Sequence, residues 1–393
     1  MKCPLSGCRV LDLGIITAGA ATSALLADLG AEVVKVESPS YRDPFRNWSA
    51  DGPQPRDGPP FFRFTNRNKR AISLDLKRPQ GRALFLRLAA ESDVVLENFR
   101  RGVMARLGID YAALRAVNPR IILASISSQG EAGPDANYVS FGSTLDAMGG
   151  LAWLTGYADG GPVVSGRDIN YPDQVVAIFA AGMVVTAWLA RAKTGAGAHL
   201  DLSQRELTSF LVGEAFVAGD VTAPRNGNAQ APFALQDCFR VAGGDWLAVT
   251  VAPEELSALR TLIGDGGKAA SAVELGTALA RWLGERPLAA ATAALASAGI
   301  AAAPVLDGKQ ALEERGRLWR IAIAETAAGV AVKGFPFQLE RAPLAIEREA
   351  PAIGADTAQV LARLGGYTRA EIEALASAGA IECAPHSINA MQG

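Results

Sequence analysis

The sequence predicts an α/β fold, and two similar stretches of chain carry this prediction. Near the N-terminus, Arg9–Leu13 is a short apolar run, a helical stretch follows through Leu29, and Glu32–Val36 is a second apolar run. Further along, a helical stretch around Gly81–Ala90 precedes the apolar run Val94–Glu97. Strands that alternate with helices in this way favour a parallel sheet.

The carboxyl ends of these strands are the expected ligand site, because backbone donors and helix N-termini converge there. The first strand is followed by Gly14–Gly19, whose glycine spacing is not that of the G-x-G-x-x-G dinucleotide motif. A long loop, Pro39–Pro60, follows the second strand, and Ile72–Leu76 is the next expected strand. The strand Ile121–Ser127 then leads into a glycine-rich segment that ends at Gly150.

The composition and pattern of the second half of the chain predict a smaller α+β domain. The chain has 393 residues, of which 49% are hydrophobic, and this is enough for a core divided between two lobes. From about Thr222 the composition changes to a linker rich in Pro, Asn and Gly. A compact stretch from Phe233 to about Val332 then combines a strand, Trp246–Val251, with alanine-rich helices.

The composition excludes several classes of partner. A net charge of −2 gives no support for a nucleic-acid partner. The apolar run Val175–Ala190 would span about 24 Å as a helix, short of the ~30 Å bilayer core, so we expect a buried helix and no membrane partner. No secretory hydrophobic segment is recognised at the N-terminus, and four scattered cysteines do not form a disulfide framework, which favours the cytoplasm.

The sequence lacks the residues that most familiar catalytic sites require. The chain has two histidines, and we expect the first, His199, to have a hydrogen-bonded structural role. No H-E-x-x-H, paired C-x-x-C, G-x-S-x-G or phosphate-loop motif is present, so the sequence predicts no metal site and no serine-hydrolase or kinase chemistry. A carboxylate nucleophile remains, because aspartate is already ionised at pH 7 and needs no histidine partner.

Asp173 is the strongest candidate for such a nucleophile. It follows Pro172 and precedes an uncharged run, Gln174–Leu189, which places it at a helix start. Asp at this place is typical of an N-cap, so a purely structural role and a catalytic one both stay open. Glycines such as Gly142 and Gly149 are candidates for close backbone approach near a reacting carbonyl, although turns are their commoner use.

A family resemblance supports the catalytic role. Asp173, Arg191, the Thr194–Gly197 turn, Asp201 and Ser203 together resemble the family III CoA-transferases of the CaiB/BaiF type, which include formyl-CoA transferases and acyl-CoA racemases. The resemblance extends over nearly the whole chain. It implies Asp173 as the nucleophile, coenzyme A or an acyl-CoA as substrate, and no metal.

The resemblance also implies which residues hold coenzyme A. They are Thr17, Ala18, Leu74, Asp75, Lys77, Asn98, Phe99, Arg100 and Arg106. Independently of the family, a 3′-phosphate and a pyrophosphate need several cationic donors. Candidates in chain order are Arg67, Lys69, Arg70, Lys77, Arg100, Arg101 and Arg106. The chain departs from the family at Ala177, where Gly is common, and at Ser38, where many members have Arg; Arg42 and Arg46 are candidates to replace that Arg.

The resemblance further implies the organisation of the molecule. Residues 1–224 form the CoA-binding large domain that carries Asp173, residues 225–332 form the small domain, and residues 333–393 return to the large domain. The Rossmann-like sheet of the large domain is thus built from both ends of the chain. Two chains are expected to form an interlocked dimer, either a homodimer or a heterodimer with a related chain.

The implied reaction moves CoA from a donor acyl-CoA to a carboxylic acid through an aspartyl mixed anhydride. The segment Glu37–Arg46 resembles transferases that move CoA from succinyl-CoA to substituted succinates such as benzylsuccinate, and other dicarboxylates are also candidates. One alternative is a 2-methylacyl-CoA racemase or epimerase, but Pro134 stands beside Asp135 where related racemases have a His-Asp pair. The other alternative is a non-catalytic partner subunit, and the presence of Asp173 argues against it.

Overall fold

The computed structural model describes residues 3–48, 59–165, 170–217, 225–313, 323–326, 329–335, 337, 339–342 and 344–384. The chain divides into two compact units. The large unit comprises Met1–Leu151, Ser165–Glu214 and Ile321–Gly393, and the small unit comprises Ala152–Val164 and Ala215–Arg320.

The large unit contains most of the regular elements. Its strands are β1 (Arg9–Asp12), β2 (Glu32–Glu37), β3 (Lys69–Leu74), β4 (Val94–Glu97), β5 (Ile122–Ser127), β6 (Ala198–Ser203), β10 (Ile323–Glu325), β11 (Ala331–Lys333) and β12 (Ile381–Glu382). Its helices are α1 (Ala18–Asp28), η1 (Pro44–Arg46), α2 (Pro60–Asn66), α3 (Pro79–Ala90), α4 (Val103–Leu107), α5 (Tyr111–Val117), α6 (Gly142–Met148), α8 (Tyr171–Thr194), α9 (Gln204–Leu211), α16 (Thr357–Gly365) and α17 (Arg369–Ser377). Two short helices, α7 (Leu151–Leu154) and α10 (Gly213–Val217), span sequence boundaries between the units.

Seven strands of the large unit form one sheet in the order β12-β3-β2-β1-β4-β5-β6. Strands β1 to β6 are parallel, and β12 pairs antiparallel with β3. The parallel part has the strand order 3-2-1-4-5-6 of doubly wound sheets, in which ligands bind at the carboxyl ends of the strands. The predicted α/β fold is therefore confirmed, and strands from both ends of the chain lie in the sheet.

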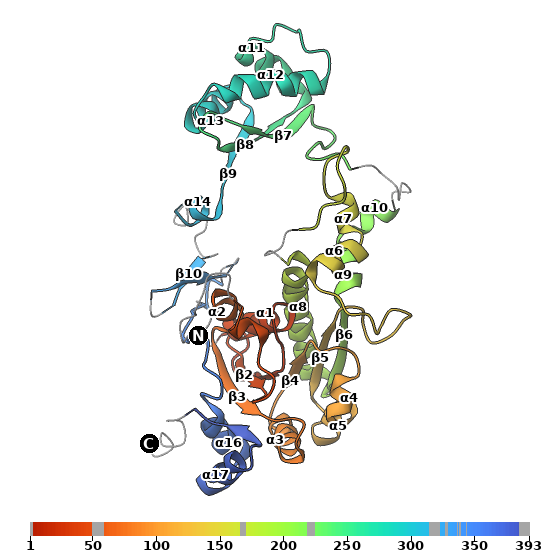
Figure 1. Cartoon of the computed structure of the whole chain (residues 1–393), viewed down its shortest axis with the longest axis vertical. Helices are drawn as coiled ribbons and strands as arrows, with labels where there is room; N and C mark the ends of the chain where they lie inside the picture. The colour runs from red at the N-terminus through yellow and green to blue at the C-terminus, as the bar shows by residue number, and fades with distance from the viewer. Residues whose placement is uncertain are drawn as a thin grey trace. The chain divides into compact units, whose positions relative to one another are not determined.

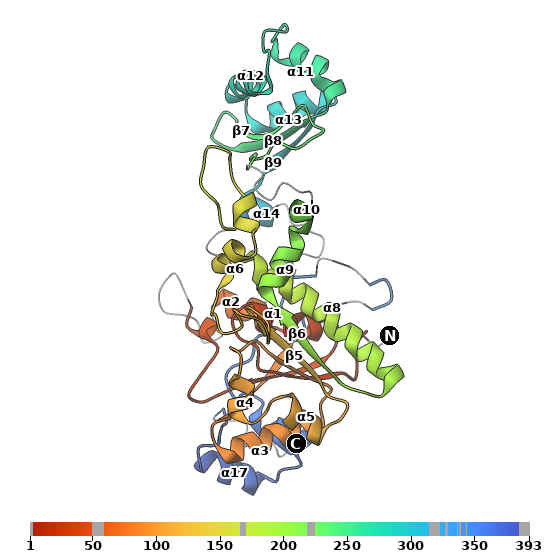
Figure 2. The same cartoon turned by 90° about the vertical axis from the view of Figure 1, so that its right-hand side faces the viewer.

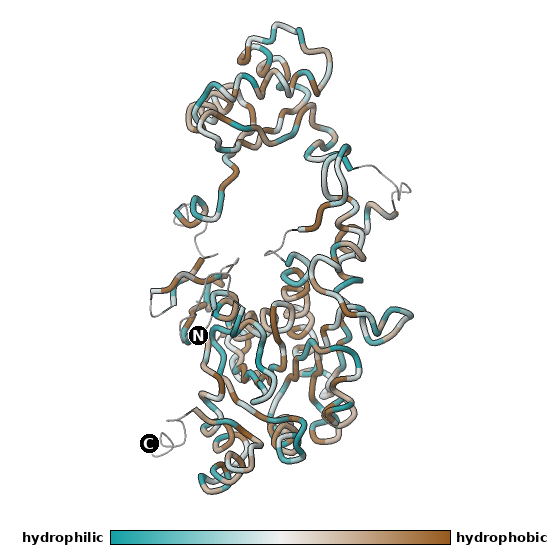
Figure 3. The backbone as a smooth tube through the Cα atoms, viewed as in Figure 1, coloured by the Kyte–Doolittle hydropathy of each residue, from teal (hydrophilic) through white to brown (hydrophobic). Residues whose placement is uncertain are grey.

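Helices cover both faces of this sheet (Figures 1 and 2). On one face, α1 and α8 pack against each other and on the strands, with Leu26 and Val184 in their shared core. On the other face, α3, α5, α16 and α17 enclose a second core that includes Phe85 and Leu361. Several strands of the sheet are brown in Figure 3, as expected for parallel strands that are buried on both faces.

Helix α8 is longer and less buried than the sequence predicted. Val176 and Val184 lie on one face of the helix and are buried. Another side is open, where Ile178 is 63% exposed, Phe179 42% and Leu189 57%. By length and composition alone α8 could cross a membrane, a test that core helices of soluble proteins also pass. Its packing on α1 and the sheet is that of a partly buried core helix.

The small unit is an α+β structure. Its strands β7 (Leu235–Arg240), β8 (Trp246–Val251) and β9 (Ala301–Val305) form an antiparallel sheet in that order. Its helices are η2 (Pro253–Glu255), α11 (Leu256–Ile263), α12 (Ala272–Gly284), α13 (Leu288–Ser297) and α14 (Gly308–Glu313). The inward residues of β8, such as Leu247 and Val249, pack against Leu279 and Leu295 of the helices.

Candidate active site

Asp173 lies in the first turn of α8, three residues after the N-cap position, which Asn170 occupies. The prediction that Asp173 is the N-cap is therefore wrong, because the helix already begins at Tyr171 and includes Pro172 in its first turn. The half-buried carboxylate of Asp173 accepts hydrogen bonds from its own backbone N–H and from that of Ala18, the first residue of α1. Helix α1 thus directs its N-terminus at the carboxylate, and its dipole favours a negative charge there.

The surroundings of Asp173 make it more basic than an ordinary aspartate. Burial, the larger cause, and the nearby carboxylate of Asp146 together raise the pKa of Asp173 to about 6, against the effect of the two N–H donors. A carboxylate of this kind is ionised at neutral pH and is a better nucleophile than a fully solvated one.

Helix α6 forms one wall beside Asp173. A Cβ atom on Gly142, the first residue of α6, would lie 3.0 Å from Asp173 Oδ2 and 3.0 Å from Asn170 Oδ1, so only glycine leaves the carboxylate undisturbed. One turn further along α6, Asp146 is fully buried and accepts hydrogen bonds on Oδ2 from the backbone N–H of Ser165 at 2.9 Å and from its hydroxyl at 2.6 Å. Sequence reasoning named Gly142 only as a candidate for close approach and missed Asp146, whose signal is a carboxylate four residues after that glycine.

The loop after β1 forms a second wall. Asn98 bonds both backbone groups of Ile15, accepting its N–H at 2.8 Å and donating to its carbonyl at 3.1 Å. After Ile16, Thr17 and Ala18 are buried; Thr17 is the N-cap of α1 and Ala18 is its first residue. The side chain of Asn98 is therefore engaged with the protein itself, and Ala18 contributes a backbone N–H to Asp173.

The remaining predicted CoA-binding residues lie at the carboxyl ends of β3 and β4, which open on the same edge of the sheet as β1. Leu74 ends β3 and is fully buried, and Asp75 accepts a hydrogen bond from the backbone N–H of Lys77. After β4, the backbone N–H of Phe99 donates to Glu97 at 2.7 Å. The side chains of Lys77, Arg100 and Arg106 are exposed and make no ion pair with another described residue.

The basic run is divided between internal ion pairs and exposed cations. Arg67 pairs with Asp28, and Lys69, which is fully buried, lies 2.9 Å from Asp12. Arg70 pairs with Asp356 and Glu32. Each of these three candidates therefore already neutralises a carboxylate of the protein, which makes them weaker candidates for phosphate binding than the exposed cations. Of the candidate cations, Lys77, Arg100, Arg101 and Arg106 are exposed.

The two arginines considered as replacements for a family Arg at Ser38 also differ. Arg46 forms a two-point ion pair with Glu37 and stacks on the ring of Phe62, whose centroid lies 4.0 Å from the guanidinium carbon. Arg42 is 46% exposed at its side chain and lies 3.4 Å from Glu382. Arg42 is thus the more accessible of the two cations.

Asp135 and His199, the acid–base candidates for a racemase reaction, make contacts with other side chains of the protein. Asp135 is 2.5 Å from Arg205 in an ion pair. His199 lies on β6, with its Nε2 atom 3.0 Å from the Ser125 hydroxyl and its ring stacked on Tyr111. Both contacts are structural. Among the residues that the structure describes, no group of three His, Cys, Asp or Glu side chains could hold a metal ion.

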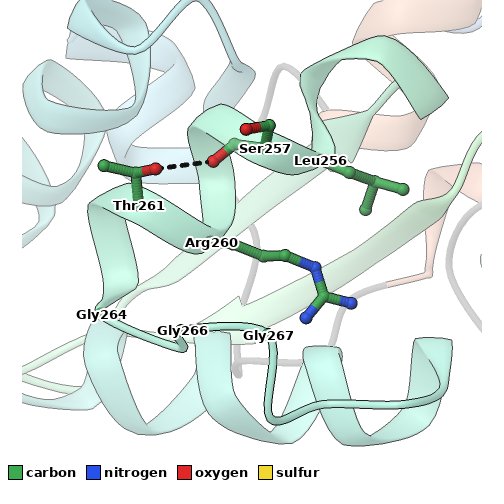
Figure 4. A pocket seen from close by; sticks show the side chains of 7 residues that line it. All are labelled: Leu256, Ser257, Arg260, Thr261, Gly264, Gly266 and Gly267. Carbon is green, nitrogen blue, oxygen red and sulfur yellow. Dashed lines mark hydrogen bonds between the residues drawn. The ribbon is translucent and has the colours of Figure 1, made fainter.

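A hollow on the small unit, with a volume of about 630 Å³, is a poor candidate for the reaction (Figure 4). It is lined by α11 and the glycine-rich turn after it, and its single cation, Arg260, already pairs with Asp265 and donates to the carbonyl of Ala269. None of the predicted site residues lies in this unit.

Comparison with known proteins identifies the family. The family model described as CoA-transferase family III matches residues 5–357. The chain is 30% identical to a succinate–glutarate CoA-transferase of Agrobacterium fabrum, over 92% of this chain and 96% of that protein. It is 34% identical to an acetyl-CoA:oxalate CoA-transferase of Acetobacter aceti, over 79% of this chain and 82% of that protein.

Two further similarities concern a longer protein and a solved structure. The chain is 32% identical over 95% of its length to the probable CoA-transferase Rv1866 of Mycobacterium tuberculosis, and spans 50% of that relative. The crystal structure of a CAIB/BAIF family protein from Brucella suis has a TM-score of 0.83 and 28% identity, covering 93% of this chain and 100% of that chain. The family model covers most of the chain and the relatives agree with it, so the chain belongs to CoA-transferase family III, a family of CoA-transferring enzymes.

Proposed function

We propose that this protein transfers CoA from a donor acyl-CoA to a carboxylic acid, with Asp173 as the nucleophile. The observation that carries the proposal is the carboxylate of Asp173 itself. It is half-buried, it accepts the first N–H of α1, and its pKa of about 6 leaves it ionised at neutral pH. Partial burial limits hydrolysis of a reactive acyl intermediate, and the pKa keeps the carboxylate reactive.

The reaction proceeds in four acyl-transfer steps. A carboxylate oxygen of Asp173 attacks the thioester carbonyl, the C–S bond breaks, and CoA leaves as a thiolate from a mixed anhydride. The thiolate attacks the aspartyl carbonyl of that anhydride, which releases the donor acid as a carboxylate and leaves an aspartyl-CoA thioester. The acceptor carboxylate attacks this thioester and expels the thiolate again. The thiolate then attacks the acceptor acyl carbon, which yields the new acyl-CoA and regenerates Asp173.

The proposed substrates are succinyl-CoA as donor and a dicarboxylate as acceptor. Relatives described as a succinate–glutarate CoA-transferase and as a succinyl-CoA:D-citramalate CoA-transferase support this choice. A substituted succinate such as benzylsuccinate stays a prediction from sequence resemblance. Coenzyme A is proposed to lie along the carboxyl edge of the sheet, with its phosphates near the exposed Lys77, Arg100 and Arg106.

The proposed assembly is an interlocked dimer, either of two copies or with a related chain, that works in the cytoplasm. The exposed apolar side of α8, with Ile178 at 63% and Leu189 at 57% exposure, supports burial by a second chain. Cys3, Cys8 and Cys238 form no disulfide in the described part of the chain, which suits a reducing compartment. Sedimentation at micromolar concentration should give the mass of a dimer, and a monomer would contradict this part of the proposal.

A CoA-exchange screen tests the proposed activity. Succinyl-CoA and acetyl-CoA are offered as donors against a panel of mono- and dicarboxylic acids, and new acyl-CoA is measured by mass spectrometry. Borohydride or hydroxylamine added with donor alone should inactivate the enzyme and modify Asp173. Normal turnover by the Asp173→Asn variant would refute Asp173 as the nucleophile.

A further inference from the structure

Ile16, in the turn between β1 and α1, has an unfavourable backbone conformation. Its φ is +58°, in the left-handed region that β-branched residues rarely adopt. Strain of this kind persists only where the surrounding structure over-determines it, and it concentrates at functional sites.

Buried side chains hold the turn from several sides. Asp43 Oδ1 accepts the backbone N–H of Ile16 at 3.2 Å, and Asp43 Oδ2 lies 3.0 Å from Lys35 Nζ. The same Lys35 amine donates to the carbonyl of Gly14 at 2.7 Å. Lys35 is fully buried and Asp43 is 1% exposed. The pair therefore holds Gly14 and Ile16, the residues on either side of Ile15. Ile15 itself is held by the Asn98 side chain, which bonds both the N–H and the carbonyl of Ile15.

The Lys35 amine keeps its positive charge in this buried place. Burial by itself lowers the pKa of Lys35, but the carboxylates of Asp43, Asp12 and Glu37 outweigh it and raise the pKa above its usual value. Lys35 is consequently protonated at neutral pH and can bond Asp43 and the Gly14 carbonyl at the same time.

The clamped turn ends at the candidate nucleophile. Two residues after Ile16, the backbone N–H of Ala18 donates to the Asp173 carboxylate. The direction of that N–H depends on the path of the chain through Ile16, since Thr17 between them is buried and already begins to turn into α1. A relaxation of Ile16 to negative φ would redirect the start of α1.

We propose that Lys35 and Asp43 are positioning residues for acyl transfer: they hold the left-handed turn at Ile16 and so aim the Ala18 N–H at Asp173. This inference rests on the proposed function of Asp173. A buried ion pair as such is weak evidence for stability, because apolar replacements of similar volume are often tolerated. What distinguishes this pair is that both partners bond the backbone of one strained turn beside the nucleophile.

The test combines removal of the clamp with removal of the strain. Asp43→Ala should lower kcat for CoA transfer by about 10²-fold, the usual effect of a misplacement near 1 Å, while the donor KM changes less than about threefold. Ile16→Gly alone should keep kcat within about threefold of the wild type, because glycine adopts positive φ freely. The double variant Asp43→Ala/Ile16→Gly should recover at least about tenfold of the lost kcat.

A matched control comes from the small unit. Asp265 is 8% exposed and pairs with the partly exposed Arg260, so Asp265→Ala removes a buried carboxylate and its ion pair far from this turn in the sequence and should leave kcat within about twofold. If Asp43→Ala does not fold, Asp43→Asn replaces it. Asparagine keeps one acceptor for Ile16 and presents an N–H group to Lys35, so a smaller loss and the same recovery by Ile16→Gly are expected.

Two results would overturn the inference. One is a kcat within threefold of the wild type when Asp43 is replaced; the other is a loss of kcat that Ile16→Gly does not reverse. Failure of the proposed function is separable, because it would appear as turnover by Asp173→Asn. An inactive Asp173→Asn variant together with a fully active Asp43→Ala variant removes only the positioning role.

Discussion

The ionised carboxylate of Asp173 should destabilise the folded protein, and replacing it by asparagine should reveal the cost. Folding raises the pKa of Asp173 from 3.8 to about 6, mainly through burial. At ~1.36 kcal/mol per pH unit, this difference corresponds to about 3 kcal/mol at pH 8, an upper value because the side chain is partly exposed to screening solvent.

The sign follows from which state releases its proton first. Below pH 3.8 the carboxyl is protonated in both states and costs nothing. Between 3.8 and about 6 the unfolded chain ionises first, so the free energy of unfolding falls as the pH rises. Linkage gives a destabilisation of about 1.6 kcal/mol at pH 5 and about 3 kcal/mol at pH 8.

Equilibrium urea unfolding of wild type and Asp173→Asn at pH 5 and pH 8, at one protein concentration, measures this effect. The difference in free energy of unfolding, variant minus wild type, should rise by about 1.4 kcal/mol from pH 5 to pH 8. The variant should also lose turnover. Glu313→Gln, which removes an exposed carboxylate of the small unit, controls for the change of one charge. A difference that does not depend on pH would refute the argument that burial makes Asp173 basic.

Three further sets of variants and one exchange measurement probe the site. Gly142→Ala should reduce kcat by about 10²-fold with little change in thermal stability, because its Cβ would lie 3.0 Å from Asp173 Oδ2, and normal turnover would contradict this packing. Asp146→Asn should move the acid limb of the kcat/KM profile to lower pH, since the Asp146 charge raises the pKa of Asp173; an unmoved or raised limb would count against that coupling. Lys77→Ala and Arg106→Ala should raise the donor KM more than they lower kcat, and equal KM values for CoA and dephospho-CoA thioesters would leave the 3′-phosphate contact unsupported. In D₂O, the enzyme should not exchange the Cα proton of a 2-methylacyl-CoA, because Asp135 is paired with Arg205; rapid exchange without an acceptor acid would favour the racemase alternative.

Much of the sheet was legible in the sequence because its strands are buried on both faces. Parallel strands covered by helices appear as short, nearly continuous apolar runs, and those at Arg9–Asp12, Glu32–Glu37 and Val94–Glu97 were placed within about a residue. The run from Gln174 to Leu189 marked α8, but its start was misplaced because a Pro-Asp step fits both an N-cap and the first helical turn. That ambiguity is local, and no sequence pattern resolves it.

For the candidate site too, the sequence identified some residues and could not assign the role of others. The sequence by itself singled out Asp173, since the chain offers few other nucleophiles and the motif around it is specific to one family. It could not separate free cations from paired ones: Lys69 and Lys77 look alike in a basic run, yet one is buried against Asp12 and the other is exposed.

What the sequence determined, then, is the order of apolar strands and helices and the residue types available for chemistry, because both are properties of the local chain. The tertiary structure alone decided that the charge of Asp146 and the N–H of Ala18 act on Asp173, and that Lys35 bonds Asp43 and Gly14. These contacts join segments far apart in the chain, and they depend on strand order and helix packing. The electrostatics of the carboxylate follow from them, since burial and neighbouring charge are set only when the sheet and its two helical layers are assembled.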